Sequence, residues 1–366
     1  ALIELSEEGE ILSYRFEKTV IRSRIKGVYK ELNDIKSGVA DEATLKKYEC
    51  VMAVLPQMEK LSEILRQNKL NRGAPQLETA ESKLVIDENE RCIDVIPRQR
   101  GFYEELIEDF MLVANECAAR FGEENKLCFV YRIHEDPAED KIDNLCQTLS
   151  ILGVEIPPHK SGILKPAHMS EILKNSKDTD KALVINNLVL RSMAKAKYSV
   201  EPIGHYGLVL SDYAHFTSPI RRYPDLTIHR IMSEFLENKS SSETNRKFQK
   251  FANASAEHST DAEIRAMRIE RGCEDCYKAE YMSAFIGEEF EGVICSVMDF
   301  GVFVTLENTC EGLVKIESMG DGSYDVTEGL SIRNSNTGVK YEVGQKVKVK
   351  VVACNVSAGE VDFELC

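Results

Sequence analysis

The sequence lacks any apolar run that approaches the roughly 20 residues needed to span a membrane, and it opens with no signal-peptide pattern. It also lacks a paired cysteine framework, because its 11 cysteines are odd in number and scattered. Such thiols are typical of a reducing cytosol, so we expect a cytoplasmic protein. Cys273-x-x-Cys276 is the single close pair, and no second pair completes a zinc site. Because this pair lies in a charged, helical stretch, a structural role is favoured over metal binding.

Positive charge is scarce as well. The chain carries 46 lysines and arginines against 61 aspartates and glutamates, a formal net charge of −15. This balance argues against a nucleic-acid coat protein with a uniformly basic surface, but it allows a focused basic channel inside an acidic shell. With 366 residues, 43% of them hydrophobic, the chain is long enough for two or three domains.

The first 200 residues alternate short strands with amphipathic helices. Residues 1–6 and 11–21 predict a β-hairpin around the turn at 7–10. The other elements expected in this part are helices at 23–35, 41–71 and 104–121, a hairpin of 83–87 with 91–96, a buried strand at 127–133, and two or three helices between 137 and 197.

Residues 204–230 combine features that favour an anion-binding loop. They predict a short strand at 206–210, an aromatic and hydroxyl-rich loop, and a helix from about 221 to 236. Arg221 and Arg222 stand where the loop becomes the helix; backbone N–H groups there favour anions, and a guanidinium can donate two parallel hydrogen bonds to a phosphate. From residue types alone, a buried turn whose arginines pair with carboxylates is the alternative. Four rings of the stretch offer flat faces on which bases can stack: Tyr213, His215, Phe216 and Tyr223.

The order of these residues resembles the signature of the ribonuclease II / ribonuclease R family. The matching runs are His-Tyr-Gly-Leu at 205–208, Tyr-Ala-His-Phe-Thr-Ser-Pro-Ile-Arg-Arg-Tyr-Pro-Asp at 213–225, and His-Arg at 229–230. The resemblance extends over nearly the whole chain. It implies an α+β fold, with a partial catalytic domain of helices around a mixed sheet followed by an all-β barrel. It also implies metal-dependent hydrolysis of single-stranded RNA from the 3′ end to nucleoside 5′-monophosphates.

The last part of the chain changes to short strands with glycine turns. Strands are expected at 290–297, 301–306, 311–316, 345–352 and 360–365, which fit a small OB-type barrel. The runs at 292–294, 299–304 and 311–314 resemble the S1 RNA-binding domain. The expected domains are therefore a catalytic-domain portion at 1–284 and an S1 domain at 285–366.

The S1 resemblance implies aromatic contacts to RNA. Phe300 and Phe303 occupy the positions that stack on single-stranded RNA, and Tyr324 is a weaker candidate. For Phe303 a core position is equally compatible, since Val302 and Phe303 must point to opposite faces of one strand. From residue 284 onward there are 6 basic and 14 acidic residues, so bulk charge cannot bind RNA strongly here.

The family resemblance also implies roles for residues of the catalytic part. Arg221 would clamp the scissile phosphate, with Arg222 as a further RNA contact. Glu270 would help to hold the 3′-terminal nucleotides, although a solvated helix residue is the alternative. Tyr29 matches a tyrosine near the terminal ribose.

Two positions depart from the family pattern. Asp109 stands where relatives often have a glutamate that contacts the 2′-hydroxyl, and Glu108 is its neighbour. Leu77 stands where relatives often place a phenylalanine that sandwiches the last bases, and a leucine cannot stack.

Three further residues of the matching pattern are expected to have structural roles. For Asp225 and His229 a helix-stabilising pair is favoured over a ligand role, and for His134 a structural role is favoured.

The family's cofactor is magnesium, held by a run of aspartates that we expect N-terminal to Ala1, in a longer protein. The densest acidic group in this chain, at 136–143, opens a predicted helix, so capping is favoured over metal binding. We therefore expect no metal site in this chain, and we expect the chain alone to be inactive.

The expected partner is single-stranded RNA, with no membrane, and the protein is expected to be monomeric. The rival hypothesis is a non-catalytic RNA-binding protein that keeps both folds. An aspartate cluster before Ala1 would favour the enzyme, and a true start at Ala1 would favour the binder.

Overall fold

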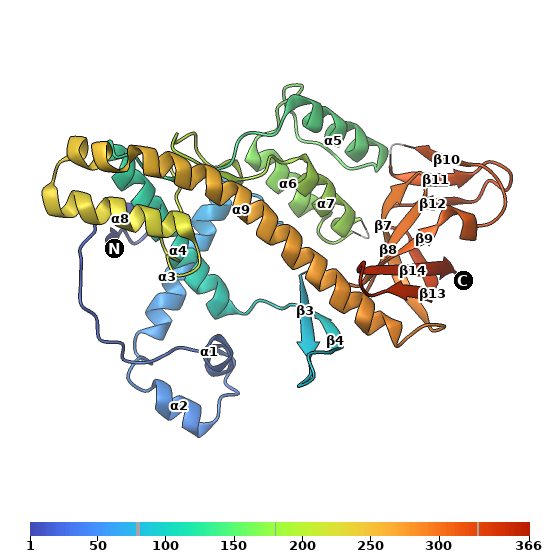
Figure 1. Ribbon diagram of the computed structural model, residues 1–366, viewed down its shortest axis with the longest axis horizontal. Helices are drawn as coiled ribbons and strands as arrows, with labels where there is room; N and C mark the ends of the chain where they lie inside the picture. Colours follow the sequence, from blue (N-terminus) through green and yellow to red (C-terminus); the bar gives the residue numbers. More distant parts are fainter. Residues whose placement is uncertain (78–80, 180, 328) are drawn as a thin grey trace.

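The computed structural model describes residues 1–77, 81–179, 181–327 and 329–366. A largely helical region leads into a closed β-barrel at one end of the molecule (Figure 1). This confirms the expected α+β fold. The helices are α1 (Tyr29–Lys36), α2 (Glu42–Tyr48), α3 (Leu55–Asn71), α4 (Phe102–Glu124), α5 (Glu139–Ile151), α6 (Pro166–Ser176), α7 (Ala182–Ser192), α8 (Tyr223–Asn238) and α9 (Ser241–Ser283).

Short antiparallel pairs of strands occur in the helical region, and a second set of strands forms the barrel and a small sheet beside it. The paired strands of the helical region are β1 (Leu2–Leu5) with β2 (Ile11–Arg15), β3 (Ser82–Ile86) with β4 (Cys92–Pro97), and β5 (Tyr131–Ile133) with β6 (Lys197–Ser199). The barrel strands are β7 (Glu289–Met298), β8 (Gly301–Leu306), β9 (Glu311–Lys315), β13 (Lys346–Asn355) and β14 (Glu360–Leu365), and the small sheet contains β10 (Tyr324–Thr327), β11 (Ser331–Asn334) and β12 (Lys340–Glu342).

The main core of the helical region lies between α4, α8 and the first half of α9. Residues 127–133 pass through it, with Phe129 fully buried. Phe16, just after β2, packs edge-on against Phe121 and Phe216, at ring-centroid distances of 5.3 and 5.2 Å. The core therefore ties the N-terminal hairpin to the loop that precedes α8.

The long helix α9 connects the core of the helical region to the barrel. Its 43 residues, about 65 Å at 1.5 Å per residue, run from α8 to the barrel (Figure 1). Phe248 and Ala252, in its first half, are buried in the main core. Ala279 and Met282, near its end, are buried in the core of the barrel.

The β3–β4 hairpin belongs to the packing of the barrel although it lies some 200 residues earlier in the chain. Cys92 and Val95 are buried in the same cluster as the barrel interior. The Ser82 hydroxyl lies 2.7 Å from the Thr309 hydroxyl, and the Cys92 N–H donates to the Glu280 carboxylate of α9 at 3.2 Å. The hairpin and α9 thus fix the barrel against the helical region.

Three expected elements in the first half of the chain were wrong in extent. The second strand ends at Arg15 rather than at residue 21, because its antiparallel partner β1 begins at Leu2, which pairs with Arg15. The helix expected from residue 23 begins at Tyr29. The helix expected at 41–71 is two helices, because Pro56 lacks an N–H and fits only the first turn of α3.

Two further expectations fail for reasons of context. Residues 206–210 form no strand: Tyr206–Leu208 is a single 3-10 turn, followed by Val209 at φ 55°. The buried strand expected at 127–133 is a strand only over Tyr131–Ile133. The hairpin β3–β4, helix α4, the helices between 137 and 197 and the five barrel strands are confirmed, whereas β10, β11 and β12, with their polar sequences, were missed.

No helix over the described residues is both long and apolar enough to cross a membrane.

Gly301 starts β8 at a point where the chain tolerates no side chain. Its φ is +150°, and an added Cβ would lie 2.1 Å from the Val314 carbonyl oxygen. We expect Gly301→Ala to lower the free energy of unfolding by at least about 2 kcal/mol, from backbone strain and a displaced β8–β9 pairing. Urea unfolding of the whole chain measures this.

The matched control is Gly272→Ala in α9, where an added Cβ meets nothing within 4 Å. Alanine is the better helix former, so this variant should gain up to about 1 kcal/mol. Equal effects of the two substitutions would contradict the packing described for β8.

Candidate nucleic-acid interface

Residues 211–222, here called the arginine loop, connect the Tyr206–Leu208 turn to α8. Side chains from two helices hold its backbone. Asn115 of α4 accepts through Oδ1 from the N–H groups of Phe216 (2.9 Å) and Thr217 (3.2 Å). Asp225 of α8 accepts through Oδ1 from the N–H of Ser218 at 2.7 Å. Since both side chains are buried, these hydrogen bonds hold the backbone of residues 216–218 from inside the core.

The two arginines of the loop have different environments. The Arg222 side chain is 16% exposed and donates to Asp225 Oδ1 at 2.8 Å, and Asp225 itself is fully buried. Arg221 is exposed, and no carboxylate among the described residues lies within ion-pair distance of it. The carboxylate pairing considered from residue types therefore describes Arg222, whereas Arg221 is presented to solvent.

A cluster of rings backs the loop. His205 packs edge-on against His134 and Tyr213, at centroid distances of 5.0 and 5.3 Å, and His215 packs against Tyr213 and Tyr198 at 5.7 Å. Burial lowers the pKa of His205 to about 3 and that of His215 to about 2, and Arg222 adds to the second effect. Both imidazoles are therefore neutral near pH 7, so they leave the arginines as the positive groups of the loop.

Asp225 and His229 do not form the helix-stabilising pair expected from their spacing. His229 instead donates from Nε2 to the Phe216 carbonyl at 2.9 Å and stacks on the Phe216 ring, with centroids 4.3 Å apart. The expectation failed because the loop folds back over α8 and binds both side chains. His134 accepts the Gly207 N–H through Nδ1 at 3.2 Å and bonds the Ala194 carbonyl through Nε2 at 2.9 Å, contacts that hold the 206–208 turn.

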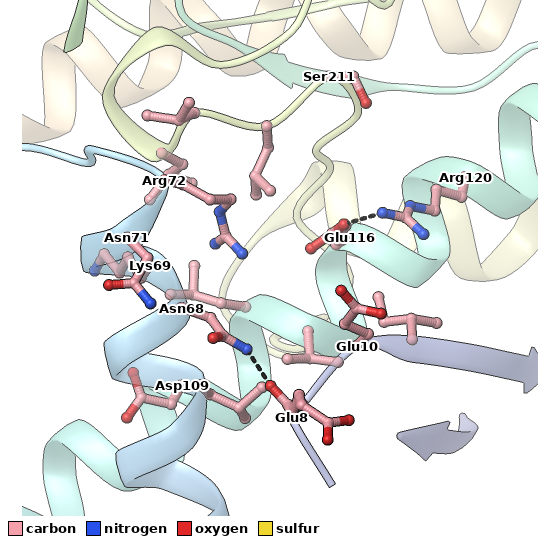
Figure 2. A pocket seen from close by; sticks show the side chains of 18 residues that line it. Glu8, Glu10, Asn68, Lys69, Asn71, Arg72, Asp109, Glu116, Arg120 and Ser211 are labelled. Carbon is pink, nitrogen blue, oxygen red and sulfur yellow. Dashed lines mark hydrogen bonds and ion pairs between the residues drawn. The ribbon is translucent and has the colours of Figure 1, made fainter. Parts of the chain in front are cut away.

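A cavity of about 660 Å³ lies between α3, α4, the β1–β2 turn and residues 208–211. Arg72 points into its middle, and Glu116 pairs with Arg120 on one wall (Figure 2). Asn68 joins α3 to the β1–β2 turn at this cavity by donating to the Glu8 carbonyl at 2.5 Å. Because residues 208–211 lead directly into the arginine loop, this cavity adjoins it in sequence and in space.

A second cavity of about 660 Å³ lies on the other side of Lys69 and Asp109, which line both cavities. Leu77 and Glu108 line it too. Its basic residues are Arg66, Lys69, Arg98 and Arg100. The two cavities thus share a wall and form a line from Leu77 to residue 211.

Within this line, Asp109 and Glu108 differ in access. Asp109 is 7% exposed and accepts from the Ser62 hydroxyl at 2.7 Å and from Arg66 at 3.1 Å. The Glu108 side chain is 48% exposed, between Lys69 (3.8 Å) and Arg100 (3.6 Å). Of these two carboxylates, Glu108 is therefore the one that a ligand in the cavity can reach.

Of the other predicted residues of the catalytic part, the structure brings Leu77 to the second cavity but neither Tyr29 nor Glu270 to either cavity. Leu77 is half-buried against the α5–α7 cluster. Tyr29 begins α1 and is 44% exposed, and Glu270 is exposed on α9. Neither Tyr29 nor Glu270 lines either cavity. Their contacts to RNA, like those of Arg222, stay predictions.

Phe300 and Phe303 form an aromatic pair on the barrel. Phe300 is 54% exposed, and its ring meets that of Phe303 edge-on at 6.2 Å. Val302 and Val304 fill the barrel, so the half-buried Phe303 lies on the outer face between them. Tyr324 packs against the barrel cluster and donates to the Met319 carbonyl at 2.7 Å.

Among the described residues, no three His, Cys, Asp or Glu side chains come together in a way that could hold a metal ion. In the acidic group at 136–143, Glu139 and Asp140 lie in the first turn of α5, and Asp143 accepts from the Gly162 N–H at 3.1 Å. Cys273 and Cys276 lie unpaired on α9.

Sequence reasoning missed Asn115 and the basic residues of the cavities. Arg98 and Arg100 carry a weak signal, because they follow a predicted strand and precede a predicted helix. Asn115 carries none, since it stands within an apolar helical pattern.

The helical region and the barrel correspond to two known types of domain. A model of the RNB domain matches residues 1–238, and a model of the S1 RNA binding domain matches residues 283–365. The chain belongs to the RNB family.

Named relatives agree with this assignment. Ribonuclease R 1 of Lactococcus lactis is 37% identical over 99% of this chain and 44% of its own length, and ribonuclease R of Thermotoga maritima is 35% identical over 99% and 51%. A solved structure of Mycoplasma genitalium RNase R with ribose-methylated single-stranded RNA has a TM-score of 0.89 and 27% identity, over 100% of this chain and 57% of that one. The chain spans about half the length of the curated relatives it matches.

The neutral histidines behind the loop predict acid sensitivity. The pKa values of His205 and His215 are lower in the folded chain than the ordinary value of 6.5, so their contribution to stability is complete above pH 6.5 and is lost as pH falls toward 3 and 2. Between pH 6.5 and 5.5 we expect a loss of about 1 kcal/mol per histidine. Urea unfolding at each pH measures it.

His215→Gln should reduce this loss, whereas His258→Gln, on the exposed face of α9, should leave it unchanged. A parent protein equally stable at both pH values would contradict the assigned neutral state.

Proposed function

We propose that this chain is the RNA-gripping part of a hydrolytic 3′-to-5′ exoribonuclease that degrades single-stranded RNA to nucleoside 5′-monophosphates. The observation that carries the proposal is the exposed guanidinium of Arg221, which has no carboxylate within ion-pair distance among the described residues, on a loop whose backbone is held by Asn115 and Asp225. Membership in the RNB family supports the reaction class.

In this proposal Arg221 binds the scissile phosphate. A guanidinium donates two parallel hydrogen bonds to phosphate oxygens, and its interaction strengthens as charge develops on them. Arg222 supports the same loop through Asp225.

The line of cavities would receive the 3′ end. Lys69 and Arg100 can neutralise phosphates there, and Glu108 can accept a hydrogen bond from a 2′-hydroxyl, which distinguishes RNA from DNA. Leu77 offers apolar contact without stacking. The basic residues are offset by the carboxylates Glu81 and Glu105 in the same cavity, so we expect contact-specific rather than bulk electrostatic binding.

Magnesium, when bound, supplies an activated water and neutralises charge on the phosphate in this class of reaction. The described residues of this chain do not offer the clustered ligands that it needs. We therefore assign them binding and positioning roles only.

A non-catalytic RNA-binding protein with the same two folds is the second candidate, and the missing ligand cluster among the described residues favours it. RNA binding without cleavage by the natural full-length product, in the presence of magnesium, would select this candidate.

The purified 366-residue chain should hydrolyse RNA slowly or not at all, because its described residues hold no metal-ligand cluster. Incubation with labelled oligoadenylate and magnesium, followed by separation of the products, measures this. Rapid magnesium-dependent release of monophosphates would show that a metal site within the chain was missed.

In a preparation that turns over RNA, Arg221→Ala should lower the rate at saturating RNA by about 10²–10³-fold, with a smaller loss of affinity. Arg246→Ala, an exposed arginine of α9, is the matched control and should leave both unchanged. Loss of affinity with a full saturated rate would mean that Arg221 only positions RNA.

Phe300→Ala should weaken binding of single-stranded RNA by about 1–3 kcal/mol if one base stacks there. The salt dependence should stay the same, since no phosphate contact is removed. Titration of fluorescent RNA at two salt concentrations measures both, with Val339→Ala, also exposed on the barrel region, as control. Parental affinity in a folded Phe300→Ala protein would place the RNA-binding face of the barrel elsewhere.

A further inference from the structure

The Asn115 side chain bonds three points of the arginine loop. It lies on α4, is 2% exposed, and accepts through a single oxygen from two successive backbone N–H groups, those of Phe216 and Thr217. Its amide nitrogen donates to the Tyr213 hydroxyl at 3.1 Å. All the polar atoms of its side chain are therefore engaged with one loop.

The next contact passes the constraint along the chain. The Ser218 N–H is held by Asp225, and the Ser218 carbonyl accepts from the N–H groups of Arg221 (3.3 Å) and Arg222 (3.0 Å). Ser218 thus connects residues 216–218, whose backbone is hydrogen-bonded to buried side chains, to the part of the loop that contains Arg221. After Ser218 the chain is exposed to solvent, and Ile220 is fully exposed.

These contacts make the direction of Arg221 depend on a residue that it does not touch. The held N–H groups have no other acceptor among the described residues, and an unpaired buried N–H is costly. If the acceptor is lost, the loop must move until water or another group replaces it. The backbone position from which the Arg221 side chain extends, a few residues further on, is then no longer fixed.

We propose that Asn115 is a positioning residue that holds Arg221 in its phosphate-binding orientation; this rests on the proposed role of Arg221. Asn115 acts through the backbone at 216–218 and makes no contact with RNA itself.

The first test measures the loop alone. Asn115→Leu removes the acceptor and keeps the number of side-chain heavy atoms and their branched arrangement. Asn115→Asp keeps an oxygen for both N–H groups, and the Tyr213 hydroxyl can reverse to donate to it. Trypsin cleavage after Arg221, followed by mass spectrometry on the whole chain, should be at least 10-fold faster in Asn115→Leu and close to parental in Asn115→Asp.

Ser62→Ala controls for general destabilisation, because it removes a buried hydrogen bond between α3 and α4 but none to the loop. Cleavage after Arg221 should stay parental in this variant. Parental cleavage in Asn115→Leu, or equal acceleration in Ser62→Ala, overturns the proposal whatever the function of the protein.

The second test connects the loop to the reaction. In a preparation that turns over RNA, Asn115→Leu should lower the rate at saturating RNA by about 10²-fold, as expected for a displaced contact. In an Arg221→Ala background the same substitution should lower it less than threefold, because the positioned group is already gone. A full additional loss in that background overturns the proposal. A parental rate in Arg221→Ala itself instead refutes the proposed role of Arg221 at the scissile phosphate, and leaves the trypsin result to decide the positioning of the loop.

Discussion

The contact on which the rest of this structure depends is made by the buried carboxylate of Asp225, which accepts hydrogen bonds from two groups. Asp225 has no exposed surface, and its Oδ1 accepts both from the Ser218 N–H and from Arg222. Its Oδ2 and the Nε of Arg222 are buried without a hydrogen-bond partner among the described residues. Removing one member of such a pair leaves an uncompensated buried charge, at a cost of about 3–5 kcal/mol. The conformation of the arginine loop, the start of α8 and the exposure of Arg221 all depend on this contact.

The second constraint is the way in which the barrel is attached. Helix α9 enters the main core at one end and the barrel core at the other, and the β3–β4 hairpin adds Cys92 and Val95 to the barrel interior. The two ends of the same hairpin lead to Leu77 and Arg98, which line the second cavity. The barrel is thereby fixed relative to the cavity line by packing contacts as well as by the chain connection.

The sequence pattern predicted an element correctly where the contacts that stabilise the element come from its own residues. The β3–β4 hairpin follows from alternation around a turn in which Asp87 accepts from the N–H groups of Asn89 and Arg91. Helix α4 follows from apolar residues at helical spacing, and the barrel strands follow from alternation, which puts Val302 and Val304 inside. Pattern failed at residues 206–210, where an apolar run became a turn because His134, from another part of the chain, bonds Tyr206 and Gly207.

The sequence by itself determined the class of fold, the family, and the presence of two adjacent arginines at a helix start, because these depend on residue order and local periodicity. Only the tertiary structure decided which of the two arginines has no carboxylate partner among the described residues. Arg222 is neutralised by Asp225 within one turn of helix, while the backbone before Arg221 is held by Asn115, 101 residues away from Phe216 in the chain. The cavity line likewise joins α3, α4 and residues 208–211, which no local pattern relates. A hydrogen bond needs its partners within about 3 Å in space, and separation along the chain carries no information about that distance until the core has packed.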